Sequence, residues 1–189
     1  MTPKEHKQAL RDQIRAAIAA LGDDEKSRSA TSIIGRIRVH RSWLDARNIL
    51  LFSPLRDEPD IGGLLEKGLS QSKTICLPRY RPASGDYEAA IIGDLARDTV
   101  TGRYGIAEPD DNCASLPLNQ LDLVLVPGVA FAACGSRLGR GRGFYDRILK
   151  TVSGLKLGVA FDEQIVDAIP SEEHDERVDG VVTPTRWME

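Results

Sequence analysis

Hydrophobic positions repeat at two different spacings along the chain, one helical and one typical of strands. Near the N-terminus they follow a helical spacing, and the residues concerned are Leu10, Ile14, Ala17, Ile18 and Leu21. Thr2 is a residue type that caps helices, Pro3 suits the first helical position, and Gly22 is a stop signal. The pattern therefore predicts a helix between Pro3 and Gly22. The same spacing predicts a second helix over residues 24–44.

Short apolar runs that end at proline, glycine or polar residues predict the strands of a buried sheet. The predicted strands are residues 48–53, 74–77, 87–92, 121–126, 155–161 and 180–183, and the predicted helices between them are residues 61–69, a helix beginning at Phe144, and residues 163–169. Residues 101–112 are predicted to be an irregular connection. Strands separated by helices favour an α/β fold: three α/β/α layers with a mostly parallel central sheet. The 189 residues fit a single domain, 1–189.

The loop between the predicted strand 121–126 and the helix that begins at Phe144 is rich in glycine and arginine. Gly135, Gly139, Gly141 and Gly143 alternate there with Arg137, Arg140 and Arg142. Glycine lets backbone amides approach a polyanion, and guanidinium groups and a helix N-terminus attract its charge. The loop is thus a candidate phosphate site, although its spacing matches neither GxxxxGK[ST] nor GxGxxG. The alternatives are an exposed turn and an arginine-glycine contact with RNA.

Charged residues elsewhere are further candidates, each with a simpler structural alternative. Lys7 and Arg11 lie one turn apart on the first helix, where a solvated face is the alternative. Glu58 follows the first strand, where open α/β sheets bind ligands, but it could equally cap the next helix. Asp146 and Asp175 are candidate Mg²⁺ ligands, and their alternatives are a first-turn helix carboxylate and an ordinary loop acid. Two arginines after the strand 74–77, Arg79 and Arg81, are expected to be solvated.

Composition narrows the class of protein. A net charge of −3 and a pI near 5.7 argue against a general nucleic-acid or membrane-surface binder, so we expect neither as a partner. No segment has the roughly 18 apolar residues of a membrane span. The three cysteines are far apart and form no CxxC pair, which favours reduced thiols and a cytoplasmic location. Cys134 beside the loop is interpreted as a small residue rather than a nucleophile.

The loop also carries a long signature, PGxAFDxxGxRLGxGxGYYDR. It is present as residues 127–131, Gly135, residues 137–139, Gly141 and residues 143–147, with Ala132 in place of the aspartate and Phe144 in place of the first tyrosine. Further matching pieces are Lys7 and Arg11, residues 57–58, 77–79, 104–109, 174–175 and 178–179. Over almost its whole length the chain resembles the 5-formyltetrahydrofolate cyclo-ligase family, whose enzymes are also called 5,10-methenyltetrahydrofolate synthetases.

The resemblance implies ATP- and Mg²⁺-dependent cyclisation of 5-formyltetrahydrofolate to 5,10-methenyltetrahydrofolate, with release of ADP and phosphate. It implies ATP contacts at Lys7, Arg11, Arg137, Leu138, Gly139, Arg140, Gly141, Arg142, Gly143, Phe144 and Tyr145. It implies folate contacts at Glu58, Arg140, Gly141, Arg142, Gly143 and Phe144, with Tyr145 also near the pterin and formyl region. Arg137, Arg140 and Tyr145 are the expected catalytic residues, and Asp146 and Asp175 the expected Mg²⁺ ligands. We expect a monomer whose partners are the folate and ATP.

Two other functions remain open at this point. One is a non-catalytic relative that keeps folate or nucleotide but, without a carboxylate at Ala132, no longer turns over. The other is a sugar-phosphate enzyme on a related scaffold, since the loop by itself recognises only anionic charge.

Overall fold

The centre of the molecule is an eight-stranded sheet with the order β13-β12-β10-β7-β1-β2-β3-β6. The computed structural model describes residues 2–102, 105–172 and 175–189. The strands of this sheet are β1 (Asn48–Leu50), β2 (Thr74–Arg81), β3 (Asp86–Ile91), β6 (Ser115–Leu116), β7 (Leu123–Val126), β10 (Leu155–Val159), β12 (Gly180–Val182) and β13 (Trp187–Met188). β12, β10, β7, β1 and β2 run parallel, while β13, β3 and β6 join the edges antiparallel. The sheet is therefore mainly parallel, as the sequence predicts.

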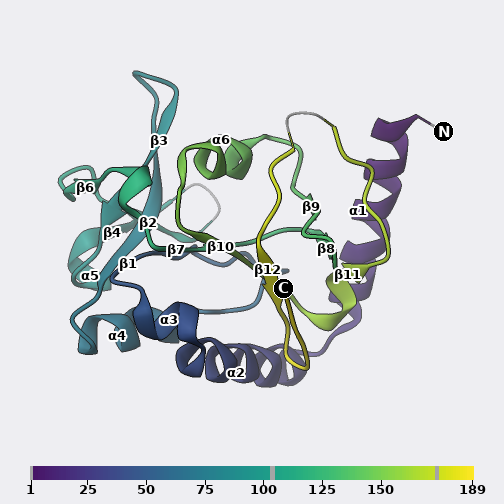
Figure 1. Cartoon of the computed structure of the whole chain (residues 1–189), viewed down its shortest axis with the longest axis horizontal. Helices are drawn as coiled ribbons and strands as arrows, with labels where there is room; N and C mark the ends of the chain where they lie inside the picture. Colours follow the sequence, from purple (N-terminus) through teal and green to yellow (C-terminus); the bar gives the residue numbers. More distant parts are fainter. Residues whose placement is uncertain (1, 103–104, 173–174) are drawn as a thin grey trace.

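Helices cover both faces of this sheet and make the three predicted layers (Figure 1). The helices are α1 (Pro3–Ala20), α2 (Asp23–Val39), α3 (Arg41–Asp45), α4 (Gly63–Ser70), α5 (Leu95–Asp98) and α6 (Phe144–Thr151), with short 3₁₀ turns η1 (Leu118–Gln120) and η2 (Asp162–Gln164). In Figure 1, α2, α3 and α4 lie below the sheet and α6 lies above it. Among the described residues no helix is both long and apolar enough to cross a membrane.

Successive residues of the central strands serve opposite faces of the sheet. In β7, Leu123 and Leu125 pack into the core between the sheet and the helices α2 and α4, whereas Val124 and Val126 pack into the core between the sheet and α6. All four are fully buried. A strand covered on both sides needs apolar residues at every position, which explains why this run reads as continuously hydrophobic.

A small second sheet places α1 beside the glycine-arginine loop. β8 (Ala130–Ala132) pairs with β9 (Arg137–Leu138) and with β11 (Ile165–Val166). The apolar face of α1 packs on it, and Thr2 and Glu5 form a capping box at the helix start. Ala132 is completely buried in this apolar cluster. An alanine therefore suits this position, because its methyl group packs in an apolar environment.

Several predicted boundaries are wrong. The helix 24–44 is two helices, because His40 has an extended backbone and its ring accepts a hydrogen bond from the Ser42 amide at the start of α3. β2 continues through Pro78 to Arg81. β1 pairs with β2 only as far as Cys76, so beyond it β2 is paired with β3 alone, and a proline without an N–H is tolerated there. The strands predicted over residues 48–53, 155–161 and 180–183 are each shorter in the structure, where they are β1, β10 and β12.

Two segments have a different structure from the one predicted. Residues 163–169 form η2 and β11 instead of a helix, because the buried Gln164 side chain donates to the Gly128 carbonyl and holds the chain against β8. The predicted irregular connection contains a hairpin, β4 (Thr99–Thr101) with β5 (Ala107–Pro109). β8 and β9 were likewise expected to be loop.

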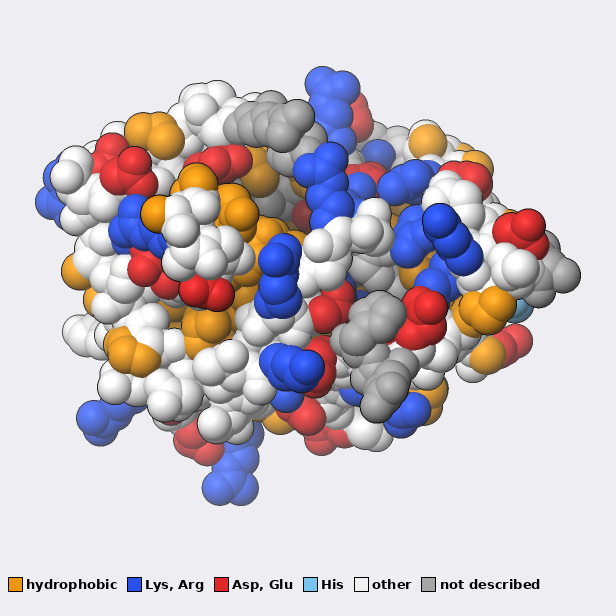
Figure 2. Space-filling model, turned by 90° about the horizontal axis from the view of Figure 1, so that it is seen from above, with side chains coloured by type: hydrophobic (Ala, Val, Ile, Leu, Met, Phe, Trp, Pro, Cys, Tyr) orange, Lys and Arg blue, Asp and Glu red, His pale blue; other side chains and the backbone are white. Residues whose placement is uncertain are grey.

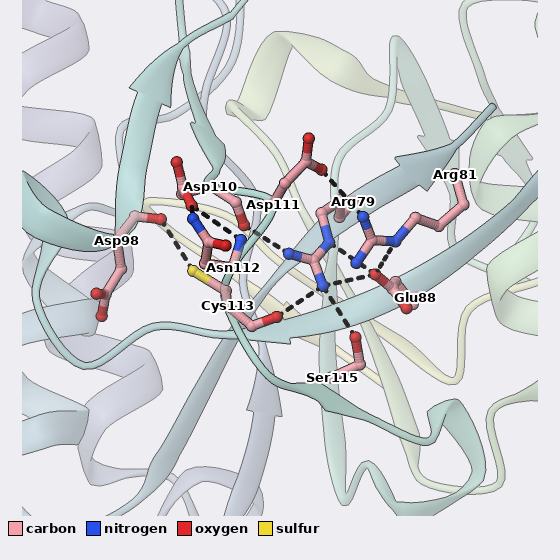
Figure 3. Close-up of polar contacts among 9 residues, drawn as sticks. All are labelled: Arg79, Arg81, Glu88, Asp98, Asp110, Asp111, Asn112, Cys113 and Ser115. Carbon is pink, nitrogen blue, oxygen red and sulfur yellow. Dashed lines mark hydrogen bonds and ion pairs between the residues drawn. The ribbon is translucent and has the colours of Figure 1, made fainter. Parts of the chain in front are cut away.

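Arg79 was predicted to be solvated, but it is buried in β2 at the centre of a polar cluster (Figure 3). Its guanidinium meets the Glu88 carboxylate at 2.6 Å and donates to the carbonyls of Asp110 and Cys113 and to the Ser115 hydroxyl. These contacts hold residues 110–115 against the sheet. Arg81, which shares Glu88, is much more exposed and reaches Asp111 at the surface.

Replacing Arg79 with methionine is expected to lower the free energy of unfolding by about 3 kcal/mol, because Glu88 and two carbonyls lose their buried donor. The matched Arg81→Met change is expected to cost less than about 1 kcal/mol, since its ion pairs are exposed to solvent. Urea unfolding of the two variants measures the difference. Equal losses in both would show that the buried cluster does not stabilise the fold.

Candidate active site

Four stretches that are far apart in the sequence meet beyond the carboxyl ends of β1 and β7. They are the start of α1, the loop after β1, the segment from β9 to α6, and Glu172 with residues 175–176, all linked by the contacts described below. Figure 2 looks onto the top of the molecule as drawn in Figure 1 and shows arginine and lysine side chains in a row, with acidic side chains between them. This is the face on which the sequence predicts an anion site.

Lys7 is buried, so the alternative of a solvated helix face does not hold at this position. Its ammonium lies 2.6 Å from the Glu172 carboxylate and 2.7 Å from that of Asp175. Burial by itself lowers the pKa of Lys7, but the hydrogen bonds and charges of the two carboxylates outweigh it and raise that pKa above its usual value. Lys7 is therefore a fixed positive charge.

Arg11 joins the same helix to the glycine-arginine loop. Its Nε donates to the carbonyl of Gly139 at 2.9 Å, and its guanidinium lies beside Gly141. Gly141 and Gly143 have positive φ angles of 89° and 62°, which L side chains rarely adopt. The loop can thus turn sharply into the N-terminus of α6 while Arg11 contacts its backbone.

Arg137 of β9 and Asp146 of α6 form the second ion pair of the site, at 2.6 Å. The Arg137 side chain is almost completely buried, and its Nε is a buried donor with no hydrogen-bond partner among the described residues. The Asp146 carboxylate also accepts from the Glu176 amide at 3.4 Å. Asp146 therefore contacts the backbone of Glu176, the residue that follows Asp175, the other carboxylate predicted to bind Mg²⁺.

Arg140 connects the loop to the segment after β1. It donates to Glu58 at 2.9 Å and to Asp57 at 2.6 Å, and the second Glu58 oxygen accepts from the Leu55 amide. Glu58 does not cap α4, because the N-cap there is Gly62 and has no side-chain bond. Burial raises the pKa of the Glu58 carboxyl, and the Leu55 amide and Arg140 offset this only in part. For Asp57, Arg140 outweighs burial and the pKa is lowered.

Aromatic rings form one wall of the site. The Phe144 ring lies 4.1 Å from that of Tyr87 and 5.0 Å from that of Tyr145, measured between centroids. Burial, followed by the negative charge of Glu58, raises the pKa of Tyr145 far above its usual value. Tyr145 therefore stays a neutral phenol at any physiological pH, and it can donate a hydrogen bond but cannot act as a base.

An apolar cavity of about 200 Å³ opens next to the Glu58 loop. It is lined by the chain after β1, the start of α4 and residues 105–107. Ser53 in its wall donates to the Ala107 carbonyl at 2.5 Å. The cavity thus has the size and apolar lining suited to part of a flat ring.

The structure brings together the predicted residues on α1, the loop, Glu58 and both aspartates. Three residues in contact with them were not predicted: Asp57, which the sequence places beside Glu58, Glu172 and Tyr87. Nothing in the sequence marks the last two. Tyr104 and His174, which belong to the matching pieces, lie outside the described residues.

The Mg²⁺ prediction rests on only two carboxylates. Within the described ranges no group of three or more His, Cys, Asp or Glu is arranged to hold an ion. Asp146 and Asp175 nevertheless fit Mg²⁺ in one respect, because that ion commonly takes only one or two protein carboxylates and completes its shell with phosphate oxygens and water.

These features define a three-layer α/β protein with a cluster of paired cationic and acidic side chains at the carboxyl edge of its sheet. The model of the 5-formyltetrahydrofolate cyclo-ligase family matches residues 3–184, and the chain belongs to that family. The family indicated by the loop signature, and the class of enzyme that it implies, a folate ligase of one-carbon metabolism, are thereby confirmed.

Relatives match over nearly their whole length. The 5-formyltetrahydrofolate cyclo-ligase of Escherichia coli K12 is 32% identical over 180 residues, covering 93% of this chain and 99% of its own. The mouse enzyme of the same name is 28% identical over 193 residues, covering 96% and 95%. The 5,10-methenyltetrahydrofolate synthetase structure from Aquifex aeolicus has a TM-score of 0.86 at 29% identity and covers 96% of this chain and 91% of its own.

Proposed function

We propose that the protein catalyses the ATP- and Mg²⁺-dependent cyclisation of 5-formyltetrahydrofolate to 5,10-methenyltetrahydrofolate, releasing ADP and phosphate. The observation that carries the proposal is that α1, which carries Lys7, packs through Arg11 against the glycine loop, which carries Arg137 and Arg140. Lys7, Arg137 and Arg140 each lie beside a carboxylate. Family membership supports the folate as substrate and ATP as its co-substrate. Monomeric state and cytoplasmic location stay predictions.

The reaction explains why a phosphate site is needed. A formamide oxygen is a poor leaving group, so attack by N10 of the folate cannot expel it directly. Transfer of the γ-phosphoryl of ATP to that oxygen forms a phosphorylated formyl group, whose carbon is electrophilic. N10 then closes the ring and phosphate leaves. Such catalysis depends on positioning and charge stabilisation and needs no covalent nucleophile from the protein.

The positions of the cations in the site support this chemistry. Arg137 still has an unpartnered buried Nε–H, a donor available to a phosphoryl oxygen. Lys7 and Arg11 come from α1, and Arg140, Arg142 and the loop amides complete the phosphate contacts. Asp146 and Asp175 would hold Mg²⁺, which when bound neutralises charge on the phosphates.

We place the folate on the side of Arg140 that faces Glu58, away from the phosphate contacts. Glu58 is a buried carboxylate that can accept hydrogen bonds from pterin N–H groups, and the apolar cavity beside it accepts part of the ring. Phe144 keeps a ring for stacking but lacks the hydroxyl of a tyrosine. Tyr145, a phenol at working pH, donates a hydrogen bond toward the reacting oxygen.

ATP turnover coupled to cyclisation tests this proposal. With 5-formyltetrahydrofolate, ATP and Mg²⁺ present, we expect one ADP per methenyl product and almost no ADP when the folate is left out. Product formation at the same rate without ATP would remove the phosphorylated intermediate from the account. ADP release without product would point to an ATPase instead.

ATP is expected to bind at least about tenfold more weakly without Mg²⁺ than with it. Lys7 is neutralised by Glu172 and Asp175 in the structure, so ATP alone must separate an ion pair and leave a carboxylate facing its own negative charge. Titration calorimetry with and without Mg²⁺ measures this dependence. In Asp175→Asn the Mg²⁺ dependence should become smaller, and an unchanged dependence in that variant would count against Asp175 as a ligand.

A further inference from the structure

Glu172 contacts the site but has no role in the cyclisation proposed above. Its carboxylate lies 2.6 Å from the ammonium of Lys7, a residue that we assign to the phosphates of ATP. Asp175 meets the same ammonium at 2.7 Å, and we assign it to Mg²⁺. Two carboxylates thus share one buried cation, and the chemistry described so far uses only Asp175.

The two carboxylates differ in how firmly they are held. The Glu172 side chain is 50% exposed, against 21% for that of Asp175. The Asp175 carboxylate also accepts a hydrogen bond from the Glu172 amide at 2.7 Å, and the Asp175 amide donates to the Glu172 carbonyl at 3.0 Å. The backbone of Glu172 is therefore fixed, and rotation of its long side chain is enough to take the carboxylate from Lys7 into solvent.

Lys7 has a fixed position, because the helix that carries it is held on two sides. Lys7 shares the buried stripe of α1 with Leu10 and Ile14, which pack against the small second sheet. Arg11, one turn further along, donates to the Gly139 carbonyl of the glycine loop. A phosphate that uses Lys7 must therefore come to the ammonium where it lies.

The charges around that ammonium oppose a phosphate. With both carboxylates ionised, one positive and two negative charges lie within ion-pair distance of one another, which leaves a local excess of one negative charge. Lys7 attracts a phosphoryl oxygen only when one carboxylate has moved away or is neutralised by a cation. Glu172 is the carboxylate that can move, since it is the more exposed of the two.

We propose that Glu172 competes with ATP for Lys7: when no nucleotide is bound, its carboxylate occupies the place of a phosphoryl oxygen on the ammonium, and ATP displaces it into solvent. The proposal rests on the proposed function, because that function assigns Lys7 to the phosphates. Glu172 thereby weakens nucleotide binding without touching the reacting atoms. Its return to Lys7 also favours the release of ADP after each turnover.

The direction of the effect of Glu172→Gln tests this competition. Glutamine keeps the length of the side chain but removes the charge that binds Lys7. We expect the Kd of ATP in the presence of Mg²⁺, measured by titration calorimetry without folate, to fall about three- to tenfold. Glu172→Asp, which keeps the charge on a shorter side chain, should lie between the wild type and Glu172→Gln. An unchanged or higher Kd in Glu172→Gln would overturn the proposal, because Glu172 would then not obstruct the nucleotide.

Lys7→Met separates competition for the ammonium from general charge repulsion. If Glu172 acts through Lys7, adding Glu172→Gln to Lys7→Met should change the Kd of ATP by less than about twofold. The same tightening with and without Lys7 would show repulsion alone and overturn the competition.

Glu163→Gln is the matched control, since it removes the same charge from an exposed position of η2, which packs against α1. It should leave the Kd of ATP unchanged. Tightening equal to that in Glu172→Gln would overturn the competition even if Lys7→Met did not fold.

The outcomes distinguish this proposal from the proposed function. Wild-type protein that forms methenyl product, together with an unchanged Kd of ATP in Glu172→Gln, would refute the competition alone. Wild-type protein that binds ATP but forms no product would refute the cyclisation, and the same Kd values would still decide the competition. Absence of ATP binding to the wild type would refute both.

Discussion

Replacing Arg137 with glutamine is expected to lower kcat for methenyl product by about 10²- to 10³-fold, the usual cost of losing one preorganised donor to a developing charge. The structure gives the reason. The Arg137 guanidinium is buried, bound on one side to Asp146, and has an unused Nε–H. Glutamine retains polarity but removes the positive charge from the phosphoryl position. Steady-state kinetics with saturating ATP and Mg²⁺ measures the loss.

The controls separate catalysis from folding. Because Asp146 loses its partner in Arg137→Gln, some stability is also lost, and the double variant Arg137→Gln with Asp146→Asn should recover stability without recovering activity. Arg38→Gln, at an exposed position on α2, should match the wild type in both respects. If Arg137→Gln turned over within about twofold of wild type, Arg137 would not be part of the phosphoryl site.

Replacing Arg140 with glutamine is expected to lower kcat/KM for the folate by about 10²-fold and to shift the acidic limb of its pH profile to higher pH. Arg140 is the charged partner of Glu58, whose carboxyl already has a raised pKa because it is buried. Without the guanidinium, the charged form of Glu58 is disfavoured further, so Glu58 takes up a proton at a higher pH. If the ionised carboxylate binds the pterin, activity falls as the pH drops through that raised pKa.

The matched variant is Glu58→Gln, which cannot ionise and should remove this acidic limb altogether. Its kcat/KM should be low and nearly independent of pH in the acidic range. If Glu58→Gln kept the acidic limb of the wild-type pH profile, that limb would belong to another group. An unchanged limb in Arg140→Gln, with normal KM for the folate, would separate Arg140 from Glu58 in function.

Much of the architecture follows from the hydrophobic pattern. The run Leu123–Val126 reads as a strand covered on both faces because both faces are covered, and the capping residues of α1 lie at its observed start. The errors occur where tertiary contacts outweigh the local pattern. β8 and β9 are only two or three residues long, and they exist because α1 and β11 pack against them. The sequence predicts a strand end at Pro78, but β2 continues there. Proline has no N–H to donate, and Pro78 pairs with β3 on one side only.

The candidate site could be predicted residue by residue but not pair by pair. The signature names Arg137 and Asp146, yet the partner of Lys7 is 165 positions away in Glu172, and no local pattern connects them. The burial of Arg79 was missed for the same reason, since its acceptors lie on a segment about 30 residues further along the chain. Of the two positions that depart from the signature, Ala132 is an apolar core position here.

The most direct test of the proposed function follows the absorbance of the methenyl product in a mixture of the purified protein, 5-formyltetrahydrofolate, ATP and Mg²⁺. We expect the absorbance to rise only when all four are present, and the rise to disappear in Arg137→Gln. Tight binding of both ligands without any rise would contradict the account and identify a non-catalytic relative. Activity on a sugar phosphate without ATP would contradict it in a different way.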